Sequence, residues 1–518
     1  MTASSDPMSP EDGQADAVAY LEATGTLWAN ERAERIDTHA ARIFLAGDRA
    51  WKLKRAVSLG YLDFSTCERR RAALEAELTL NRRTAPLLYI GLRPLRRDAN
   101  GNFSIDGTGD IVDWLLEMHR FPDEALLARL ADEGLLDDGL ILSLADRVAA
   151  FHRQTEPCAD RSGHARILSV IDGNRQSMER YPDILAAPAA ARLIARQREI
   201  ADRFARLLDA RAEQGRVRHG HGDLHLANIA VIAGEPVPFD CLEFDPSLAT
   251  TDLLYDIAFL LMDLWRRGLR RQANIFFNRY LDLSPADEGG AALLPLFLSV
   301  RATIRAHALA AQADHDEATV SARDYLTFAA EVLGSVPPSL AAVGGLSGTG
   351  KSTIARLIGG EIGRPPGARI VRSDVIRKRL AGLEPESPLP KDAYTKAASQ
   401  NVYREIDRIA GSVLTAGQSV ILDAVFSDSK ERDAAEQLAR RHSVPFVGFW
   451  LEAPIEMLQS RIQGRRNDAS DADASVAILQ QSYDLGDIGS WHRVDASAQS
   501  EEVAARVLSI LRQNAARS

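Results

Sequence analysis

Apolar residues follow two different spacings along the chain, and the change between them falls near residue 338. Before that point, helix-like spacing predicts helices over residues 66–83, 123–154, 187–212 and 251–283. A hairpin is also predicted, because the strand-like runs Arg42–Leu45 and Ala50–Lys54 are separated by the turn residues Gly47 and Asp48. After residue 338, strand-like runs alternate with helical segments, as a parallel α/β sheet requires; the runs cover about residues 340–344, 368–372, 418–422 and 445–451.

The segment Gly334-Ser335-Val336-Pro337-Pro338-Ser339 is the predicted boundary between these two regions. Its two prolines cannot donate backbone hydrogen bonds, and the glycine and serines favour a turn. A chain of 518 residues also exceeds what one hydrophobic core normally serves. We therefore predict a disordered polar tail over residues 1–15, an α+β domain over residues 16–336 and an α/β domain over residues 337–518.

Composition and charge argue against several classes of protein. The N-terminal residues lack the basic flank and apolar core of a secretory signal, and no apolar run approaches the roughly 18 residues that span a bilayer. Cys67, Cys158 and Cys241 lie far apart, which indicates neither a disulfide framework nor a zinc site. The net charge of −10 disfavours binding to long nucleic acid. We therefore predict a cytoplasmic protein without a membrane segment, and the sequence leaves its oligomeric state open.

The strongest motif in the chain follows the first strand of the second domain. It fits G-x-x-x-x-G-K-[ST] without a mismatch, and a helical segment follows it. Glycines let backbone N–H groups turn toward phosphate oxygens, while the lysine adds a charge for the β- and γ-phosphates and the serine can bind Mg²⁺. The motif therefore predicts a nucleotide site made of Gly345, Leu346, Ser347, Gly348, Thr349, Gly350, Lys351, Ser352 and Thr353.

Later residues narrow the meaning of this P-loop. Asp374 follows the second strand, where a carboxylate would lie beside the γ-phosphate, and Asp423 ends the next strand, where it would orient Mg²⁺ or its water. Arg461, Arg465 and Arg466 come after the strand at 445–451. Taken alone, Asp374 could equally cap a helix, and the arginines could be ordinary surface residues.

Together, these residues resemble a small P-loop kinase of the gluconate kinase, zeta toxin or polynucleotide kinase type, over about residues 340–515. The resemblance implies that Asp374 accepts or orients the acceptor hydroxyl and that Arg377 binds acceptor or product. It also implies that the segment from Arg461 to Arg466 is a lid that clamps phosphates. Lys351 would then assist the transfer, with ATP as donor and Mg²⁺ as its metal ion.

A second group of residues that suits phosphoryl transfer lies in the first domain. Asp223 lies in a loop, Asn228 follows five residues later, and Asp240 comes at the end of the next strand. One carboxylate can accept a hydroxyl proton, while the amide and the second carboxylate hold Mg²⁺ on the phosphates. Metal binding by His221 and His225 alone is disfavoured, since no further ligands lie at a suitable spacing.

These residues resemble the aminoglycoside phosphotransferase branch of the protein-kinase-like fold, over about residues 30–330. His221-Gly222-Asp223 with Asn228 matches its H-G-D-x-x-x-x-N loop, and Asp240 matches its metal-binding aspartate. The resemblance implies that Asp223 is the catalytic base, that Asn228 and Asp240 are Mg²⁺ ligands, and that His221 and Asp256 support the loop.

The nucleotide side of the first domain is less well defined by the sequence. Lys52 and Lys54 lie on one face of a strand, and one of them should reach the phosphates; Lys52 is favoured by its likeness to the kinase V-A-I-K strand. Glu77, or else Glu75, would pair with that lysine, and Glu117 and Met118 would lie in the hinge that contacts adenine. No G-x-G-x-x-G loop precedes Lys52, so a buried salt bridge without catalytic meaning is the alternative.

The leading hypothesis is a fusion of two ATP-dependent kinase domains that phosphorylate a hydroxyl of a small molecule, such as a sugar or an aminoglycoside-like compound. It resembles two-part bacterial proteins that join an aminoglycoside phosphotransferase-like domain to a P-loop kinase. One alternative keeps the P-loop kinase active and makes the first domain a binding or regulatory module. Another is a P-loop enzyme that acts on nucleic-acid 5′-ends or nucleotide sugars. The acceptor itself cannot be read from the sequence.

Overall fold

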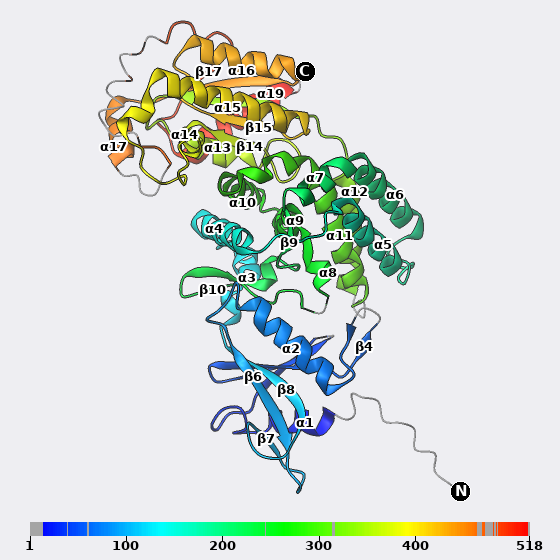
Figure 1. Cartoon of the computed structure of the whole chain (residues 1–518). Helices are drawn as coiled ribbons and strands as arrows, with labels where there is room; N and C mark the ends of the chain where they lie inside the picture. Colours follow the sequence, from blue (N-terminus) through cyan, green and yellow to red (C-terminus); the bar gives the residue numbers. More distant parts are fainter. Residues whose placement is uncertain are drawn as a thin grey trace. The chain divides into compact units, whose positions relative to one another are not determined.

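The computed structural model describes residues 14–515 apart from residues 39, 60–61, 244, 313–315, 464–468, 472–479, 481–482 and 484. The chain forms two compact units (Figure 1). The first unit consists of Met1–Leu135, Phe151–Cys158 and Arg218–Thr251, and the second of Leu136–Ala150, Ala159–Val217 and Asp252–Ser518. The chain therefore passes between the units several times. The predicted boundary at residues 336 and 337 falls inside the second unit and stays a prediction about where two domains were joined.

The first unit contains a six-stranded antiparallel sheet (Figure 1). The predicted hairpin is confirmed, because β2 and β3 pair with Ala46 opposite Arg49 and are joined by Gly47, whose φ of +55° suits a tight turn. In spatial order the strands are β1 (Glu34–Asp37), β2 (Ala41–Ala46), β3 (Arg49–Lys54), β8 (Asp110–His119), β6 (Tyr89–Arg97) and β7 (Phe103–Ile105).

Helix α2 (Cys67–Asn81) packs on β6 and β8 and corresponds to the predicted helix at 66–83. It begins where the Thr66 side chain accepts a hydrogen bond from the backbone N–H of Arg69, and its buried Leu74 joins a core with Leu88 and Leu116. The other elements of this unit are short: α1 (Ala15–Glu22), β4 (Ser58–Leu59), β5 (Leu62–Asp63), η2 (Asp123–Ala125), α3 (Leu127–Asp132), η3 (Leu226–Asn228), β10 (Ile229–Ile232), β11 (Glu235–Pro238) and α8 (Pro246–Ala249).

Two residues of the predicted N-terminal tail are part of the folded protein. The buried side-chain amide of Gln14 donates to the carbonyl of Lys54 at 3.0 Å and to Asp113 at 2.7 Å. Ala15 begins α1, whose Val18 and Leu21 pack in a core with residues of the sheet. Residues 1–13 lie outside the described residues.

The second unit begins with a group of helices. Three of the segments predicted as single helices are each divided into shorter elements, and one of them, 187–212, forms α6 and α7. The segment 123–154 forms η2, α3 and α4, and 251–283 forms β12, α9 and α10; Gly134 and Gly268, with φ of +71° and +77°, mark two of the breaks. The helices are α4 (Asp138–Gln154), α5 (Gly163–Met178), α6 (Ala187–Arg203), α7 (Ala205–Glu213), α9 (Leu253–Arg266), α10 (Arg270–Leu283), η4 (Pro285–Leu293), α11 (Leu294–Ala310) and α12 (Asp316–Glu331). The last four residues of α4 belong to the first unit, and so do two of the three residues of each of the short strands β9 (Val217–His219) and β12 (Thr250–Asp252).

One helical stretch of this group, Pro285–Ala310, is long and apolar enough to cross a membrane by length and composition, although its sequence is not a continuous apolar run. Its most apolar window is 72% buried inside the protein. Burial of this extent is typical of a core helix. A helix that is apolar on all of its faces must be covered either by protein or by lipid.

The rest of the second unit is built on a five-stranded parallel sheet. The four predicted strands are confirmed, and a fifth strand, β17, was missed because only Val494 of its sequence His-Arg-Val-Asp is fully buried. In spatial order the strands are β14 (Arg369–Arg372), β15 (Val420–Asp423), β13 (Leu340–Gly345), β16 (Phe446–Glu452) and β17 (His492–Asp495). The helices are α13 (Lys351–Gly359), α14 (Ser373–Leu380), η5 (Lys391–Tyr394), α15 (Lys396–Thr415), α16 (Ser429–Arg441), α17 (Ile455–Gln463) and α19 (Ser500–Ala515).

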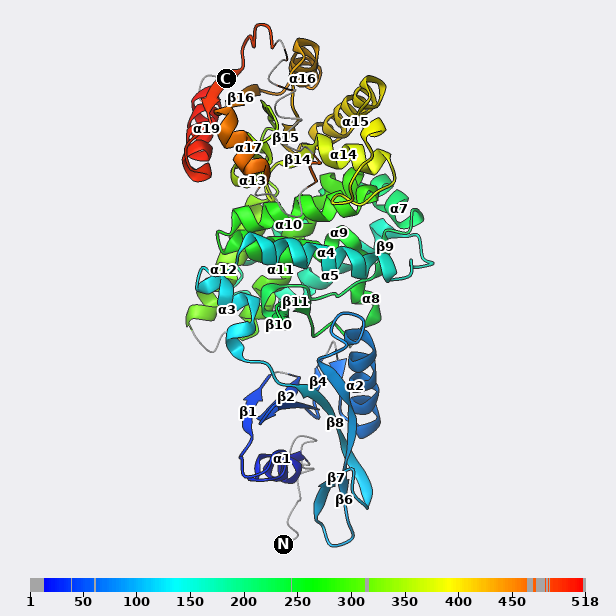
Figure 2. The ribbon, with the colours of Figure 1, turned by 90° about the vertical axis from the view of Figure 1, so that its left-hand side faces the viewer.

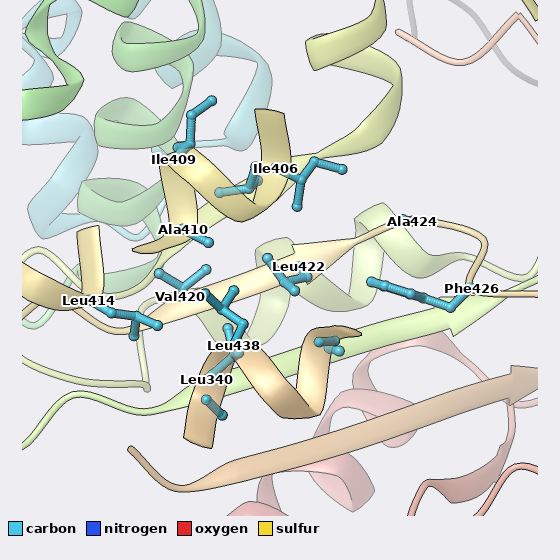
Figure 3. Close-up of a cluster of buried hydrophobic side chains, with 14 of the residues drawn as sticks. Leu340, Ile406, Ile409, Ala410, Leu414, Val420, Leu422, Ala424, Phe426 and Leu438 are labelled. Carbon is cyan, nitrogen blue, oxygen red and sulfur yellow. The ribbon is translucent and has the colours of Figure 1, made fainter. Parts of the chain in front are cut away.

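Both faces of this sheet are covered, as a parallel sheet requires. Leu340 and Ala342 face one core, which α15 and α16 complete (Figure 3). Ala341 and Val343 face the other core, which α13 and α19 complete, and Figure 2 shows the helices on either side. The alternation of neighbouring residues between the two cores explains why these strands are almost wholly apolar.

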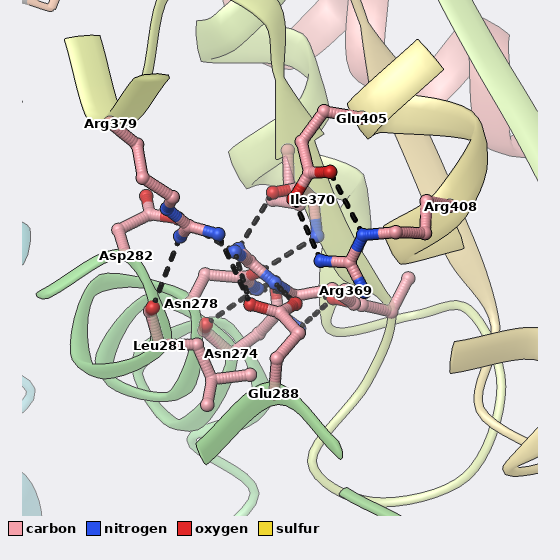
Figure 4. Close-up of polar contacts among 11 residues, drawn as sticks. Asn274, Asn278, Leu281, Asp282, Glu288, Arg369, Ile370, Arg379, Glu405 and Arg408 are labelled. Carbon is pink, nitrogen blue, oxygen red and sulfur yellow. Dashed lines mark hydrogen bonds and ion pairs between the residues drawn. The ribbon is translucent and has the colours of Figure 1, made fainter. Parts of the chain in front are cut away.

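The free edge of this sheet is occupied by α10, within the same unit (Figure 4). The backbone N–H of Ile370 donates to the Asn278 side chain at 2.7 Å, and the Asn274 side chain donates to the carbonyl of Ala368 at 2.8 Å. Gly359 permits this approach, because a Cβ there would lie 2.2 Å from the Asn274 side-chain oxygen. Two asparagines one helical turn apart thus satisfy the groups that an edge strand leaves unpaired.

The buried Arg369 of β14 forms the charged centre of this junction (Figure 4). Its guanidinium contacts Glu288 at 2.6 Å and Asp282 at 2.8 Å, and donates to the Asn278 side chain at 3.1 Å. The helical group and the parallel sheet are therefore joined by a desolvated ion cluster as well as by packing.

Candidate active sites

The first candidate site gathers a lysine and two carboxylates in the first unit. Lys52, on β3, contacts Glu77 of α2 at 2.7 Å and Asp240 at 2.8 Å. Burial alone lowers the pKa of Lys52, but Asp240 and Glu77 outweigh it, so the pKa is raised well above its ordinary value and the side chain is charged. The structure thus brings together three residues that the sequence placed at one nucleotide site.

A second lysine shares the same glutamate. Lys54 contacts the other carboxylate oxygen of Glu77 at 2.8 Å and also contacts Glu243 at 2.5 Å. Lys52 is therefore the lysine that reaches Asp240, and Lys54 lies with Glu243 in a nearly solvent-free position. Glu243 stands only three residues after Asp240 but was not predicted as a site residue.

The pKa of Glu77 reflects its interaction with the two lysines. Burial alone would raise the pKa of Glu77, but the two lysines lower it to about 2, from an ordinary value of 4.5. Glu75, the alternative partner, is half exposed and pairs with Arg71 instead. The geometry therefore favours Glu77 over Glu75 as the partner of the lysines.

Replacing Glu77 by glutamine is expected to destabilise the first unit by up to about 3–5 kcal/mol at pH 7, because the two buried lysines lose the carboxylate that they share and keep one acidic partner each. A carboxylate with a depressed pKa stabilises the fold above its unfolded pKa and loses this effect as the pH falls. The difference between wild type and Glu77→Gln should therefore shrink from pH 4.5 toward about 2. Hydrogen exchange of peptides from β3 and α2 measures it.

The matched control for this experiment is Glu75→Gln, which removes an exposed charge two residues away on the same helix. Its effect on stability should stay within about 0.5 kcal/mol. An equal effect of the two substitutions, or a difference that is constant with pH, would contradict the buried cluster.

The predicted catalytic loop is folded around Asp223. The side-chain amide of Asn228 donates to the Asp223 carboxylate at 2.9 Å and to its carbonyl at 3.0 Å, while the backbone N–H of Phe239 donates to the Asn228 carbonyl at 2.9 Å. Asn228 therefore connects the loop to the residue before Asp240. A Cβ at Gly222, where φ is +82°, would lie 2.8 Å from Leu242, so only glycine fits before Asp223.

Asp240 itself has a φ of +60°, which is unusual for a residue other than glycine. Its side chain is 41% exposed, and its backbone N–H donates to the Tyr89 hydroxyl at 3.2 Å. Strained backbone of this kind gathers at functional sites. The carboxyl and amide oxygens of Asp240 and Asn228 are hard ligands of the kind Mg²⁺ prefers.

The two residues predicted for the hinge lie within a strand of the first unit. Glu117 and Met118 lie inside β8, which pairs with β3 on one side and β6 on the other, and the Glu117 carboxylate contacts Arg93 at 2.8 Å and Arg49 at 3.4 Å. The contact of Glu117 and Met118 with adenine stays a prediction. Among the described residues, no group of three or more His, Cys, Asp or Glu side chains is arranged to hold a metal ion alone.

The second candidate site is the P-loop, which has the shape that phosphate binding needs. Gly345, Gly348 and Gly350 have φ of +139°, +90° and +90°, and a Cβ at either of the first two would lie 2.7 Å from a backbone oxygen. Lys351 donates to the carbonyl of Leu346 at 3.0 Å, so its side chain curls back over the loop. Gly350 caps α13, whose N-terminus offers its amides to an anion.

Two predicted Mg²⁺ ligands lie together beside this loop. The Ser352 hydroxyl donates to the Asp423 carboxylate at 2.5 Å, which brings the start of α13 to the end of β15. Two adjacent oxygens, one of them charged, fit a hard cation. Thr353 is exposed in the first turn of α13, and Ser347 donates its backbone N–H to the Gln480 side chain at 2.7 Å. Gln480 carried no signal in the sequence.

Asp374 lies in the first turn of α14, directly after β14. Arg372 occupies the N-cap position and no side chain caps this helix, so the capping alternative for Asp374 is not supported. Burial raises the pKa of Asp374, while Arg372 opposes the rise. A carboxylate with a raised pKa is better suited to accept a proton near neutral pH.

The arginines predicted for the lid have different outcomes. Arg461 donates to the carbonyl of Ala496 at 2.9 Å, and Arg465 and Arg466 lie outside the described residues. Arg377 donates to the carbonyl of Ala393 at 3.1 Å and stacks over Tyr394 at 4.9 Å. Their roles in binding phosphates or acceptor stay predictions.

The comparisons with known proteins first define the class of the second domain. The AAA domain family matches residues 340–484, which include the P-loop, Asp374 and Asp423. Over 118 residues the chain is 27% identical to the adenylyl-sulfate kinase of Myxococcus xanthus. The aligned region covers 23% of this chain and 59% of that protein. The C-terminal part carries a P-loop on a five-stranded parallel sheet, as the sequence predicted, and it is similar to an AAA domain and to a kinase.

Over nearly its whole length, the chain is 31% identical to uncharacterized proteins of Mycobacterium tuberculosis and Mycobacterium bovis. The similarity extends over 493 residues, which are 92% of this chain and 95% of those proteins. The chain belongs to the same family as these mycobacterial proteins.

Solved structures are similar to separate parts of the chain. A choline kinase of Cryptosporidium parvum is 11% identical, over 58% of this chain and 88% of that chain, with a TM-score of 0.40. A sugar kinase of Janibacter is 21% identical, over 34% of this chain and 95% of that chain, with a TM-score of 0.26. No residue role depends on these similarities.

Proposed function

We propose that this protein is an ATP-dependent phosphotransferase with two catalytic sites, at least one of which phosphorylates a hydroxyl of a small molecule such as a sugar or an aminoglycoside-like compound. One observation carries the proposal: each site has its own charged lysine and its own candidate base. Lys52 and Asp223 lie in the first unit, and Lys351 and Asp374 lie in the second. A protein with only one active site would need only one such lysine and one such base.

In the first site, Lys52 holds the donor phosphates and Glu77 holds Lys52. Asp223 accepts the proton of the acceptor hydroxyl, and its orientation is fixed by Asn228. Asn228 and Asp240 would hold Mg²⁺, which neutralises charge on the phosphates. The P–O bond to the β-phosphate breaks as the acceptor oxygen bonds to the γ-phosphorus, and ADP leaves with the bonding electrons.

In the second site, the glycine-lined loop and Lys351 surround the phosphates, and Asp374 orients or deprotonates the acceptor. Ser352 and Asp423 would hold Mg²⁺, with the same charge-neutralising chemistry. Arg461 and Arg465 belong to the proposed phosphate clamp. We propose a small hydroxylated molecule rather than long nucleic acid as the acceptor of this site, because the protein is acidic overall.

One observation favours a second candidate function, in which the first domain binds without catalysing. β1 ends at Asp37 and β2 begins at Ala41, and the sequence between them contains no glycine, whereas kinases cover the phosphates with a glycine-rich loop. In this alternative, the cluster around Lys52 is a structural ion network, and only the P-loop site transfers phosphate.

The test is ADP release by the full chain with Mg²⁺, ATP and a panel of sugars, aminoglycosides, nucleosides and choline-like alcohols. We expect at least one acceptor to accelerate release, and the double variant Asp223→Ala/Lys351→Ala to abolish the acceleration. If Lys351→Ala alone abolishes every signal, the second candidate function is correct. If no acceptor accelerates release, the proposed function is wrong.

A further inference from the structure

Arg372, at the end of β14, lies among residues of the P-loop site but has no role in the function proposed above. The parallel register of β14 and β15 places it directly beside Asp423. Its guanidinium contacts the Asp423 carboxylate at 3.4 Å and donates to the Ser352 hydroxyl at 3.2 Å. Three elements therefore meet at this one cation: β14, β15 and the start of α13.

The contrast with Arg369 shows that these contacts are not simply structural. Both arginines belong to β14, but residues three apart on a strand face opposite sides of the sheet. Arg369 is 1% exposed and contacts residues of the junction with α10, whereas the Arg372 side chain is 14% exposed and contacts residues of the nucleotide site. The strand thus directs one arginine to the junction and the other to Ser352 and Asp423 of the P-loop site.

Ser352 and Asp423 are also the groups that would hold Mg²⁺, and two cations cannot occupy the same pair of oxygens. Two unit charges 4 Å apart repel by about 4 kcal/mol at a protein surface, and the divalent ion doubles this. A guanidinium displaced from these oxygens needs other anionic partners. The planar fork of arginine matches phosphate oxygens, and Arg372 is the N-cap residue of α14, whose first turn holds Asp374.

We propose that Arg372 binds the γ-phosphate of the nucleotide at the P-loop site, and that in the nucleotide-free protein it takes the place of Mg²⁺ between Ser352 and Asp423. This inference rests on the proposed nucleotide-binding function of the P-loop. Arg372 stabilises the charge of the phosphoryl group during transfer and keeps the empty site neutral. It also makes the site sensitive to the difference between ATP and ADP.

The experiment titrates the full chain with ATP and with ADP, with and without Mg²⁺, in wild type, Arg372→Gln and Arg372→Lys. The binding that Lys351→Ala removes defines the P-loop site. Arg372→Gln should weaken ATP binding at that site by about 10–100-fold and ADP binding by less than about threefold, since a charged hydrogen bond to the γ-phosphate is lost. The Mg²⁺ concentration for half-saturation with ADP should fall. Arg372→Lys should have an intermediate effect, because it keeps the charge without the fork.

Arg440→Gln is the matched control, because it removes an exposed arginine of the same domain. Equal loss of ATP and ADP affinity in Arg372→Gln, or no loss of either, would overturn the inference. If Arg372→Gln does not fold, Arg372→Lys decides: an unchanged preference for ATP over ADP then overturns it. If Lys351→Ala removes no binding, the proposed function of the P-loop fails instead, whatever the Arg372 variants do.

Discussion

Replacing Arg369 by methionine is expected to lower the free energy of unfolding of the second unit by about 3–5 kcal/mol, because the substitution leaves buried acidic groups without a counter-ion. Arg369 is almost fully buried between Glu288 and Asp282, so water cannot take its place. Burial alone would lower the pKa of Arg369, but Glu288 and Asp282 raise it above its ordinary value. Urea unfolding of the full chain measures the loss.

Two further variants separate lost charge from lost packing. Arg369→Met combined with Glu288→Gln should recover part of the stability, because one of the unpaired charges is removed. Arg408→Met removes an exposed arginine that pairs with Glu405 nearby, and it should cost no more than about 0.5 kcal/mol. A loss below about 1 kcal/mol for Arg369→Met would mean that the junction is not a stabilising contact.

This junction also decides how the two proposed activities must be studied. A fragment that begins at residue 337 would lack α10 and η4, and would expose the edge of β14 together with Arg369. An exposed edge strand promotes aggregation, so loss of function in such a fragment would have no clear meaning. Point variants of the full chain avoid this problem.

Asp223→Ala is expected to reduce phosphoryl transfer at the first site by about 10²–10⁴-fold, which is the usual contribution of a positioned general base. Mg²⁺·ATP affinity at this site should change little, because Lys52, Asn228 and Asp240 remain. The measurement is the rate of ADP release with the best acceptor of the panel, at saturating ATP, so that the loss appears in kcat.

The control for Asp223→Ala is Asp98→Ala, which removes an exposed aspartate of the same unit that bonds only within its own turn among the contacts of the described residues. Its kcat should equal that of the wild type within about twofold. If Asp223→Ala raises the KM for ATP but leaves kcat unchanged, Asp223 is a binding residue and the proposed base is wrong.

Local patterns predicted much of the fold because they report local physics. The hairpin at Gly47 and the strands around the P-loop follow from turn chemistry and from apolar runs bounded by polar residues. The long segments were correctly predicted to be helical, but the number of helices in them was not predicted. The spacing of apolar residues continues across breaks such as Gly268. Such breaks depend on which neighbours the helix packs against.

The sequence also predicted which residues the first site would assemble, but not all of their partners. Lys52, Glu77 and Asp240 are 25 to 188 residues apart in sequence and meet in the structure. Glu243 and Arg372 were missed because an acidic or basic side chain near a motif looks like any solvated charge until its burial is known. The junction at Arg369 could not be predicted, since an arginine in an apolar strand carries no sign of its distant counter-ions.

If one chain holds two nucleotide sites, as proposed, the number of ATP molecules bound per chain should be two. Calorimetric titration of the full chain with a non-hydrolysable ATP analogue and Mg²⁺ should give two equivalents for wild type. Lys351→Ala and Lys52→Met should give one each, and the double variant none. A single equivalent in wild type that Lys351→Ala abolishes and Lys52→Met leaves intact would contradict the claim.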